Sequence, residues 1–441
     1  MPYRLEDLNP PRGMRDFPPE MEILRRKVFD RIDRIFRRYG FDPLETPIVE
    51  RWEILSGKYG EEAENKLMWR FKLPYSDREF GLRFDLTVPL ARYIARYRPR
   101  LPFKRYHIGR VYRYEEPQKG RYREFWQCDV DIVGVDSPLA DAEIINVVSD
   151  IMGEFGLEYR IKINDRLLLR GLFERHLGLK DNDLILRIYR TIDKLDKIGR
   201  DKVLDELEGM GLPGEVIGEI SRIIDITGYS DVEILDSLSK YGEEEVSKSV
   251  SRISEILDLV KYRDRVEIDL SLVRGLDYYT GMIYEAVVTK PRIGSLSGGG
   301  RYDDLIGLFT GERVPAVGGS IGVERLIDAG IELGILDMGE KTYVDAGIIY
   351  LRDTDLREVI RIVDRLRGDG LNIYLPYQPY KTILHGIRDL VSRGIKHAIV
   401  IGRRELEGKT LTIQDLEERT RIEAGVGEAY KIIKGRSAKH G

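Results

Sequence analysis

The residues best suited to chemistry lie on two predicted strands that a basic loop connects. Residues 104–112 and 125–133 alternate apolar and polar side chains, as strands do, and residues 117–123 between them include Pro, Gly, Lys and Arg. The polar side chains predicted to face the interior are Arg113, Glu115, Gln127, Asp129 and Asp131. Charged groups are rarely buried unless they are paired or bound to a ligand. The pattern fits either a solvated sheet face with cross-strand ion pairs or a polar pocket under a cationic loop, suited to a phosphate-bearing substrate.

Several segments of the chain resemble those of a known family. Residues 112–115, Tyr-Arg-Tyr-Glu, and the loop after them are similar to motif 2 of class II aminoacyl-tRNA synthetases, in the form that histidyl-tRNA synthetases carry. Residues 272–281 resemble the histidine-binding signature of the same family. Weaker likenesses are to motif 1 at residues 41–50 and to motif 3 at residues 318–326. The resemblance covers essentially the whole chain, and Gln-Cys-Asp-Val-Asp at residues 127–131 is similar to archaeal or eukaryotic members.

The resemblance and the sequence patterns together predict the domain organisation. The family implies an α+β catalytic domain built on an antiparallel sheet, interrupted here by a helix-rich, acidic insertion without a chemical motif. Strand and helix patterns then alternate, which is typical of a compact α/β domain, and the resemblance implies that this domain binds the anticodon. The predicted boundaries are 1–164 and 261–330 for the catalytic domain, 165–260 for the insertion, 331–342 for a linker, 343–430 for the anticodon-binding domain and 431–441 for a basic tail.

The resemblance implies a site for ATP, which would bind with Mg²⁺. Arginine suits phosphate because it is always charged and can hold two oxygens at once. By resemblance Arg113 and Arg325 hold the α- and γ-phosphate ends of a bent ATP, and Arg274 lies opposite Arg113 across the α-phosphate; these three are the predicted catalytic residues. Glu115 is expected at the adenine end, and Tyr122 is also predicted to bind ATP. No metal-ligating residue and no protein base for a second step are predicted.

The resemblance also implies a site for L-histidine. Residues 80–89 read as a strand, a turn and a helix, with Asp85 and Thr87 predicted on one face of the strand; the alternative for either residue is a helix N-cap. By resemblance these two residues and Gln127 hold the α-amino group. An imidazole needs a polar partner for each ring nitrogen, and the resemblance implies that Asp131 and Tyr279 provide them. Tyr278 is predicted to belong to the same site.

Two further segments are candidates for contact with a ligand or with tRNA. By resemblance, the loop after motif 2 meets the acceptor end of tRNA, and its predicted contact residues are Gln118, Lys119, Arg121 and Arg123. The glycine triplet at residues 298–300 would permit close approach of the backbone to a ligand, but a bulge or a tight turn explains it equally well. It matches neither the phosphate loop nor the dinucleotide-binding glycine pattern.

Composition limits how the protein could bind nucleic acid and in which compartment it is expected. The 441-residue chain has a net charge of −4, so nucleic acid would have to be bound by local basic patches. The single cysteine, Cys128, cannot form an internal disulfide, which favours a reducing cytoplasm. No apolar run is long enough to span a membrane, and the charged, Pro-rich N-terminus does not read as a signal peptide.

The resemblance implies that the protein joins histidine to tRNA(His) through a histidyl-adenylate, and that it forms a homodimer through the catalytic domain. Two alternatives also fit parts of this pattern. One is a non-catalytic relative that regulates ATP phosphoribosyltransferase; such subunits lack the anticodon-binding domain and typically lose part of the arginine set. The other is a sensor module that binds uncharged tRNA, which occurs within larger kinase chains. The presence of a C-terminal domain and of all three arginines favours the ligase.

Overall fold

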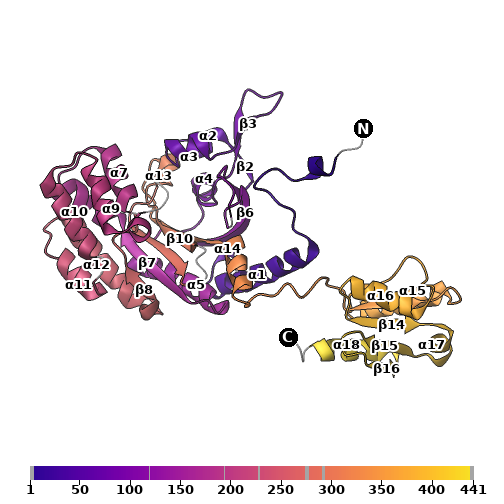
Figure 1. Cartoon of the computed structure of the whole chain (residues 1–441). Coiled ribbons are helices and arrows are strands. Elements are labelled where there is room, and N and C mark those ends of the chain that lie inside the picture. The colour runs from indigo at the N-terminus through magenta and orange to yellow at the C-terminus, as the bar shows by residue number, and fades with distance from the viewer. Residues whose placement is uncertain are drawn as a thin grey trace. The chain divides into compact units, whose positions relative to one another are not determined.

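The computed structural model describes residues 4–118, 120–192, 194–226, 229–273, 278–290 and 294–437. The chain divides into two compact units (Figure 1). The first comprises Met1–Asp16 and Val28–Leu336, and the second comprises Phe17–Lys27 and Asp337–Gly441. Among the described residues, no helix combines the length and the apolar character needed to cross a membrane.

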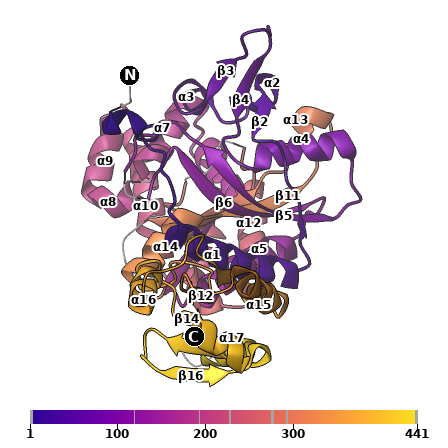
Figure 2. The same cartoon turned by 90° about the vertical axis from the view of Figure 1, so that its right-hand side faces the viewer.

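The first unit is built on a large, mainly antiparallel sheet. Eight strands of the described chain form it, in the spatial order β1, β5, β6, β11, β10, β9, β7, β8. Figure 2 labels three neighbouring strands of this sheet, β5, β6 and β11. Only the two outer pairs, β1 with β5 and β7 with β8, are parallel. The strands are β1 (Asp42–Pro43), β5 (Phe103–Tyr112), β6 (Glu124–Val133), β7 (Tyr159–Asp165), β8 (Val266–Ile268), β9 (Met282–Val288), β10 (Ser295–Arg301) and β11 (Ala316–Gly322). The predicted α+β class with an antiparallel sheet is confirmed.

The two strands predicted around the basic loop are the longest hairpin of the sheet. Strands β5 and β6 pair over ten residues each, from Phe103 opposite Val133 to Tyr112 opposite Glu124. Because side chains alternate along a strand, this register puts Arg105 opposite Asp131 and His107 opposite Asp129 on one face. The same face of β11 then carries Gly318 and Ser320, which pair with Asp131 and Asp129 in turn.

Helices and a small second sheet surround this sheet. Helix α5 (Pro138–Glu154) packs against β6, β10 and β11 and buries an apolar face; Ser137 caps its N-terminus by accepting the Leu139 N–H. Helix α4 (Thr87–Tyr97) follows a three-stranded sheet in the order β2 (Val49–Arg51), β4 (Glu79–Leu82), β3 (Arg70–Lys72). The other helices of this part are α1 (Pro19–Arg38), α2 (Trp52–Leu55), α3 (Glu61–Lys66), α13 (Gly307–Thr310) and α14 (Val323–Glu332).

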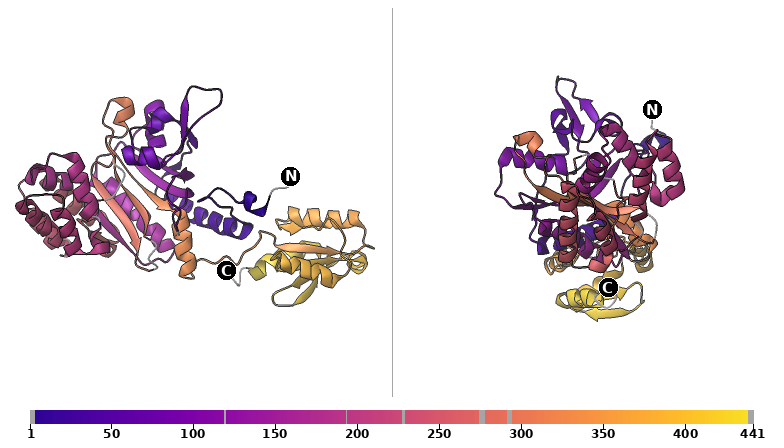
Figure 3. Two further views of the ribbon diagram at one scale, coloured as in Figure 1. Left: turned by 45° about the horizontal axis from the view of Figure 1, so that its top comes forward. Right: turned by 90° about the vertical axis from the view of Figure 1, so that its left-hand side faces the viewer.

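The described residues between β7 and β8 form helices joined by turns and loops, and these helices gather beyond one end of the large sheet (Figure 3). Helix α12 runs alongside α5, where Arg252 donates to Asp141 across the two helices. The helices are α6 (Arg166–Arg170), α7 (Asn182–Ile192), α8 (Leu195–Ile198), α9 (Arg200–Glu208), α10 (Gly214–Ile226), α11 (Asp231–Leu238) and α12 (Glu244–Leu259), with a π-helical turn at Gly171–His176.

The second unit contains a mixed sheet with helices on both faces. Its strand order in the described residues is β13 (Ile373–Tyr374), β12 (Ala346–Tyr350), β14 (His397–Ile401), β15 (Leu411–Asp415), β16 (Arg421–Ala424). The first three strands are parallel and the last two antiparallel. The helices are α15 (Leu356–Gly368), α16 (Ile383–Ser392), α17 (Arg403–Gly408) and α18 (Ala429–Ser437), so the basic segment predicted from residue 431 begins inside α18.

Alternating side chains of β12 and β14 feed two separate apolar clusters of the second unit. Ile348 and Ile399 belong to one cluster, while Ile349 and Val400 belong to the other. A strand that is buried on both faces needs apolar side chains on both faces, and these two strands have them. The predicted alternation of strands and helices is therefore present through β14, and the antiparallel strands β15 and β16 extend it.

Candidate active site

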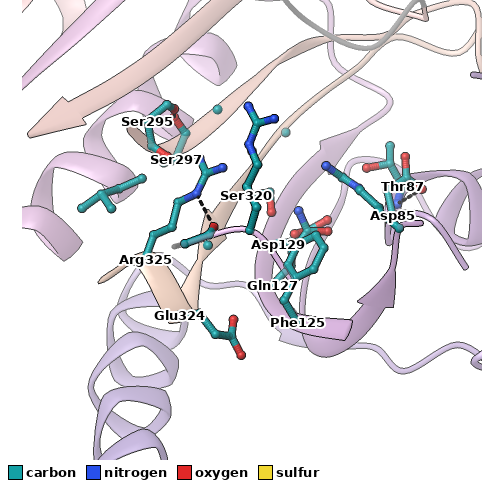
Figure 4. Close-up of a pocket in the computed structure, with 18 of the residues that line it drawn as sticks. Asp85, Thr87, Phe125, Gln127, Asp129, Ser295, Ser297, Ser320, Glu324 and Arg325 are labelled. Atoms are coloured by element: carbon teal, nitrogen blue, oxygen red, sulfur yellow. Dashed lines mark hydrogen bonds between the residues drawn. The ribbon is translucent and has the colours of Figure 1, made fainter. Parts of the chain in front are cut away.

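One cavity of the first unit collects most of the residues predicted to do chemistry. Its empty volume, which includes space open to solvent, is about 1040 Å³, and it lies over the β5–β6–β11–β10 part of the sheet. Eleven of the predicted site residues line it: Asp85, Thr87, Arg113, Glu115, Arg121, Tyr122, Gln127, Asp131, Tyr278, Tyr279 and Arg325. Figure 4 places Asp85 and Thr87 at one side of the cavity and Arg325, Ser295 and Ser297 at the other. Two predicted residues, Lys119 and Arg274, lie outside the described residues.

Asp85 occupies the turn before helix α4 rather than a strand. Strand β4 ends at Leu82 and helix α4 begins at Thr87, so the expectation that Asp85 and Thr87 share a strand face is wrong. The reason is the N-cap alternative: Asp85 Oδ1 accepts the N–H groups of Thr87 at 3.2 Å and Val88 at 3.0 Å. Two tyrosine hydroxyls also donate to this carboxylate, Tyr59 to Oδ1 and Tyr278 to Oδ2, each at 2.9 Å. Burial raises the pKa of Asp85 in spite of these donors.

Two carboxylates and an amide follow one another along the cavity face of β6. Gln127, Asp129 and Asp131 are 8%, 2% and 1% exposed. Asp131 Oδ1 accepts from the Tyr302 hydroxyl at 2.5 Å, and Asp131 Oδ2 forms an ion pair with Arg105 at 2.7 Å. In the described structure, Gln127 Oε1, Asp129 Oδ1 and Asp131 Oδ2 are buried without a hydrogen-bond partner. The ring contact predicted for Asp131 remains a prediction.

Arg105 is a residue that the sequence interpretation missed. Its side chain is completely buried, and besides the ion pair with Asp131 it donates to the Leu86 carbonyl at 3.1 Å. It therefore connects β5, β6 and the turn before α4. The available signal was its position: once β5 and β6 are aligned as a hairpin, Arg105 is the basic residue directly opposite Asp131.

The glycines of β10 and β11 make room for side chains of neighbouring strands. The triplet at residues 298–300 lies inside β10, so the bulge-or-turn explanation is wrong at those positions, although the register shifts nearby between Ser295 and Ser297. A Cβ at Gly318 would lie 2.0 Å from Asp131 Oδ1, and a Cβ at Gly319 would lie 1.8 Å from the Tyr284 hydroxyl. Only glycine fits at either position, because real Cβ atoms do not approach so closely.

Two arginines that line the cavity are held through their Nε atoms. Arg113, just after β5, donates from Nε to the Phe84 carbonyl at 3.1 Å, and its guanidinium lies over the Phe84 ring, 4.5 Å from the centroid. Arg325, in the first turn of α14, donates from Nε to Gly120 O at 2.9 Å and from Nη1 to Ser295 O at 2.8 Å. Burial lowers the pKa of Arg325, and the nearby Arg121 lowers it further. These contacts fix both guanidinium groups beside a space lined by polar groups.

Some residues of the loop after β5 line the cavity, and others do not. Arg121 and Tyr122 line the cavity, and Arg15 donates to the Tyr122 hydroxyl at 3.0 Å. Arg123, in contrast, packs its guanidinium over the Tyr114 ring at 3.8 Å and donates to the Glu115 carbonyl, so it holds the loop in place. Gln118 exchanges backbone hydrogen bonds with Arg121 and does not line the cavity. Contacts of these residues with tRNA remain predictions.

The cavity therefore combines a set of carboxylates, an amide and hydroxyls with a set of fixed guanidinium groups. The first set suits a small ligand that carries an ammonium group and ring N–H donors, and the second suits phosphate. In the described part of the chain, no group of three or more His, Cys, Asp or Glu side chains is placed to hold a metal ion.

Comparison with known proteins decides the family. A family model described as histidyl-tRNA synthetase matches residues 13–326, and a model described as an anticodon binding domain matches residues 345–436. The chain belongs to the histidyl-tRNA synthetase family. It is 50% identical to the histidine–tRNA ligase of Aeropyrum pernix over 96% of this chain and 97% of that one, and 50% identical to that of Korarchaeum cryptofilum over 93% and 96%.

Solved structures agree with this assignment. The histidyl-tRNA synthetase of Nostoc sp. PCC 7120 matches with a TM-score of 0.82 at 31% identity, covering 97% of this chain and 99% of that one. A Bacillus halodurans protein titled ATP phosphoribosyltransferase regulatory subunit/histidyl-tRNA synthetase matches with a TM-score of 0.74 over 91% and 99%; at 20% identity it shows the fold alone. The family consists of aminoacyl-tRNA ligases, so the predicted enzyme class is confirmed.

Proposed function

We propose that the protein is a histidine–tRNA ligase, which activates histidine with ATP to histidyl-adenylate and pyrophosphate and then transfers histidine to the 3′ end of tRNA(His). The observation that carries the proposal is the single cavity, in which buried acceptors for an amino acid and fixed arginines for phosphate are both present. The archaeal relatives named histidine–tRNA ligase, which are half identical to this chain over nearly all its length, support the choice of amino acid.

The activation step requires attack of the histidine carboxylate on the α-phosphorus of ATP. This reaction depends mainly on positioning and on neutralising charge that develops on the phosphate oxygens. Arg113 and Arg325 are suited to this role because their Nε atoms are already bound to protein carbonyls, which fixes the orientation of each guanidinium. By family resemblance Arg274 supplies a third positive charge. Glu115 and Tyr122 line the part of the cavity where the nucleotide is proposed to bind. Mg²⁺ would arrive with ATP and bridge its phosphates.

Histidine would bind with its ammonium group near the start of α4. Gln127 offers the buried Oε1, which has no partner in the described structure, and Thr87 lines the same part of the cavity. Asp85 provides negative charge there, although four protein donors already hold it. Burial raises the pKa of the Tyr279 hydroxyl most, and the nearby Tyr284, Asp85, Asp129 and Asp131 raise it further. We propose that Tyr279 contacts one nitrogen of the imidazole ring.

The transfer step would use the second unit for tRNA selection. The match of residues 345–436 to an anticodon-binding domain supports contact with unpaired anticodon bases. The basic loop with Gln118, Lys119, Arg121 and Arg123 is proposed to contact the acceptor end. We further propose a homodimer through the catalytic domain and a cytoplasmic setting, as the family resemblance implies.

The non-catalytic regulatory alternative is less well supported. One structural neighbour carries both names in its title, yet at 20% identity it supports the fold alone. This chain retains Arg113, Arg274 and Arg325 and matches an anticodon-binding domain, all of which a ligase uses.

Charging of tRNA tests the proposal. Full-length protein incubated with ATP, Mg²⁺, tRNA and each of the twenty radiolabelled amino acids should attach histidine alone to tRNA. Attachment of a different amino acid, or of none under conditions where the protein is folded, would refute the proposed function.

A further inference from the structure

A network of charged side chains outside the candidate active site connects the insertion helices, those between β7 and β8, with the large sheet. Its centre is Asp141 on α5, which is completely buried. Arg252, on α12, donates from Nε to Asp141 Oδ2 at 2.8 Å and from Nη1 to Asp136 Oδ1 at 2.9 Å. Arg301, the last residue of β10, donates from Nε and Nη2 to Asp141 Oδ1 at 3.0 and 2.7 Å. Asp141 therefore links an insertion helix to a central strand of the sheet.

Arg301 also contacts the segment that follows the two tyrosines of the candidate active site. Its carbonyl accepts the Thr280 N–H at 2.8 Å. A Cβ at Gly281 would lie 3.2 Å from Arg301 Cδ, so the arginine side chain packs against that glycine. The next residue along the chain, Tyr302, lines the cavity, and its ring lies edge-on to the ring of Tyr278 with the centroids 5.9 Å apart. The position of Arg301 therefore bears on the amino-acid part of the cavity through two routes.

Asp303 adds a third connection between the network and the same segment. Its Oδ1 accepts from Arg301 Nη1 at 3.1 Å and from the Ala316 N–H at 3.0 Å, and its own N–H donates to the Thr280 hydroxyl at 3.0 Å. Thr280 is thus held through both its backbone N–H and its side chain by groups whose orientation depends on Arg301.

A second cavity borders this network. Its empty volume, which includes space open to solvent, is about 1060 Å³, and Arg252, Arg301, Asp303, Thr280 and Gly281 all line it. A closely packed interior resists rearrangement, whereas side chains at a cavity wall have room to take another arrangement. A shift of α12 could therefore be passed along the network to residues 280–281.

We propose that Arg252 is a positioning residue for histidine binding, which acts through Asp141 and Arg301 to fix the segment after the two cavity tyrosines. This inference rests on the proposed function. Arg252 belongs to the insertion helices and does not line the candidate active site. The affinity for histidine therefore depends on the position of α12, and by linkage histidine stabilises the contact of α12 with α5.

Two measurements on the full-length protein test the proposal. ATP–pyrophosphate exchange gives separate KM values for histidine and for ATP, and hydrogen–deuterium exchange reports on the backbone of residues 280–288. Arg252→Met should raise the KM for histidine by about 5- to 20-fold, the range of coupling between distant sites, and should speed deuterium uptake in residues 280–288. The KM for ATP should change little.

Arg175→Met is the matched control. Arg175 also holds α12, through an ion pair with Glu245 at 3.0 Å, but it does so at the surface, with 52% of the arginine side chain accessible. Its replacement should leave both KM values and the deuterium uptake of residues 280–288 as in wild type.

The outcomes separate positioning from a merely structural role, which would lower the amount of active protein and hence the maximum rate without raising the KM of one substrate. The proposal is overturned if folded Arg252→Met keeps the wild-type KM for histidine or the wild-type deuterium uptake, if the two KM values rise by the same factor, or if Arg175→Met has equal effects. Should Arg252→Met not fold, Arg252→Lys, which keeps the charge with fewer donors, carries the test with an expected rise of about 2- to 3-fold in the KM for histidine; an unchanged KM overturns the proposal.

Failure of the proposed function gives a different result. A folded wild type that exchanges no pyrophosphate with histidine would refute that function, and the role in histidine binding with it. The comparison of deuterium uptake needs no catalysis, so it tests the link between Arg252 and residues 280–288 independently.

Discussion

Strands β6 and β14 are both buried in the middle of a sheet, yet they are buried by different means. In β14, Ala398, Ile399, Val400 and Ile401 divide between two apolar clusters of the second unit. In β6, Val130 and Ile132 alternate with Asp129 and Asp131, and the two aspartates are as deeply buried as the apolar residues. The apolar strand stabilises its unit through burial alone, whereas the charged strand needs partners for each group it removes from water.

The polar residues of β6 differ in whether the protein itself supplies their partners. Asp131 has its partner in Arg105, and Gly318 leaves the space that the Asp131 carboxylate occupies. Asp129 and Gln127 keep buried acceptors open toward the cavity. Because a buried acceptor without a partner lowers stability, β6 has a cost that the apolar residues of β14 do not have. The four predictions below test this comparison.

The largest effect is expected from a phosphate-binding arginine. Arg113→Ala should lower histidine-dependent ATP–pyrophosphate exchange by about 10²- to 10³-fold, because Arg113 is proposed to stabilise charge on the α-phosphate with a guanidinium that its contact to the Phe84 carbonyl holds in place. Arg404→Ala, at an exposed ion pair with Glu423 in the second unit, is the control and should exchange at the wild-type rate. Wild-type exchange by Arg113→Ala would remove its proposed role.

The second effect concerns the buried ion pair. Arg105→Met leaves the Asp131 carboxylate buried without its cation, which should lower the free energy of unfolding of the first unit by about 3–5 kcal/mol. Tryptophan fluorescence during urea denaturation measures this directly, since Trp52, Trp69 and Trp126 all lie in the first unit.

Arg110→Met is the matched control for that measurement. Arg110 is on the same strand, but its ion pair with Glu124 is partly exposed, with 39% of the arginine side chain accessible. Its replacement should cost about 0–1 kcal/mol. Equal losses for the two variants would mean that the buried pair is no more important than a surface pair.

The third prediction is a dependence of stability on pH. Burial raises the pKa of Asp129 from 3.8 to about 7. Between these values the folded protein holds the proton while the unfolded chain has lost it, so the wild type loses stability as the pH rises through this range. Asp129→Asn cannot ionise. The denaturation midpoint of wild type relative to Asp129→Asn should therefore rise as the pH is lowered from about 8 to about 5; a constant difference would contradict the raised pKa.

The smallest effect is expected in the apolar strand. Ile399→Val removes one buried methyl group and should destabilise the second unit by about 1 kcal/mol. Calorimetry of the full chain would detect the loss, while the tryptophan midpoint of the first unit and the rate of ATP–pyrophosphate exchange should not change. A change in either would show that the apolar core of the second unit influences the catalytic site.

Sequence predicted the hairpin and much of the site because both depend on local patterns. The alternation in residues 104–112 and 125–133 matches β5 and β6 closely, and the motif residues that were named, such as Arg113 and Arg325, line one cavity. These signals lie in short segments, where periodicity and motif spacing are read directly.

The other features of the site could not be predicted, because they depend on how strands that are distant in the sequence pair with one another. The roles of Gly318 and Gly319 follow from Asp131 and Tyr284 on other strands, which no local pattern reveals. The sequence around Arg105 predicts only a charged residue on a strand. Its role becomes clear from the strand register, which puts it opposite Asp131. Asp85 illustrates a local ambiguity: the sequence fits a ligand contact or a helix cap, and in the structure its carboxylate accepts N–H groups at the start of α4 while it also lines the cavity.

The most direct test of the central claim is ATP–pyrophosphate exchange by the purified full-length protein with each of the twenty amino acids. Exchange that depends on histidine, and on no other amino acid, is the predicted result, because it requires the amino-acid and phosphate parts of the cavity to act together. Absence of exchange with every amino acid in a folded protein would contradict the account and would favour the non-catalytic regulatory alternative.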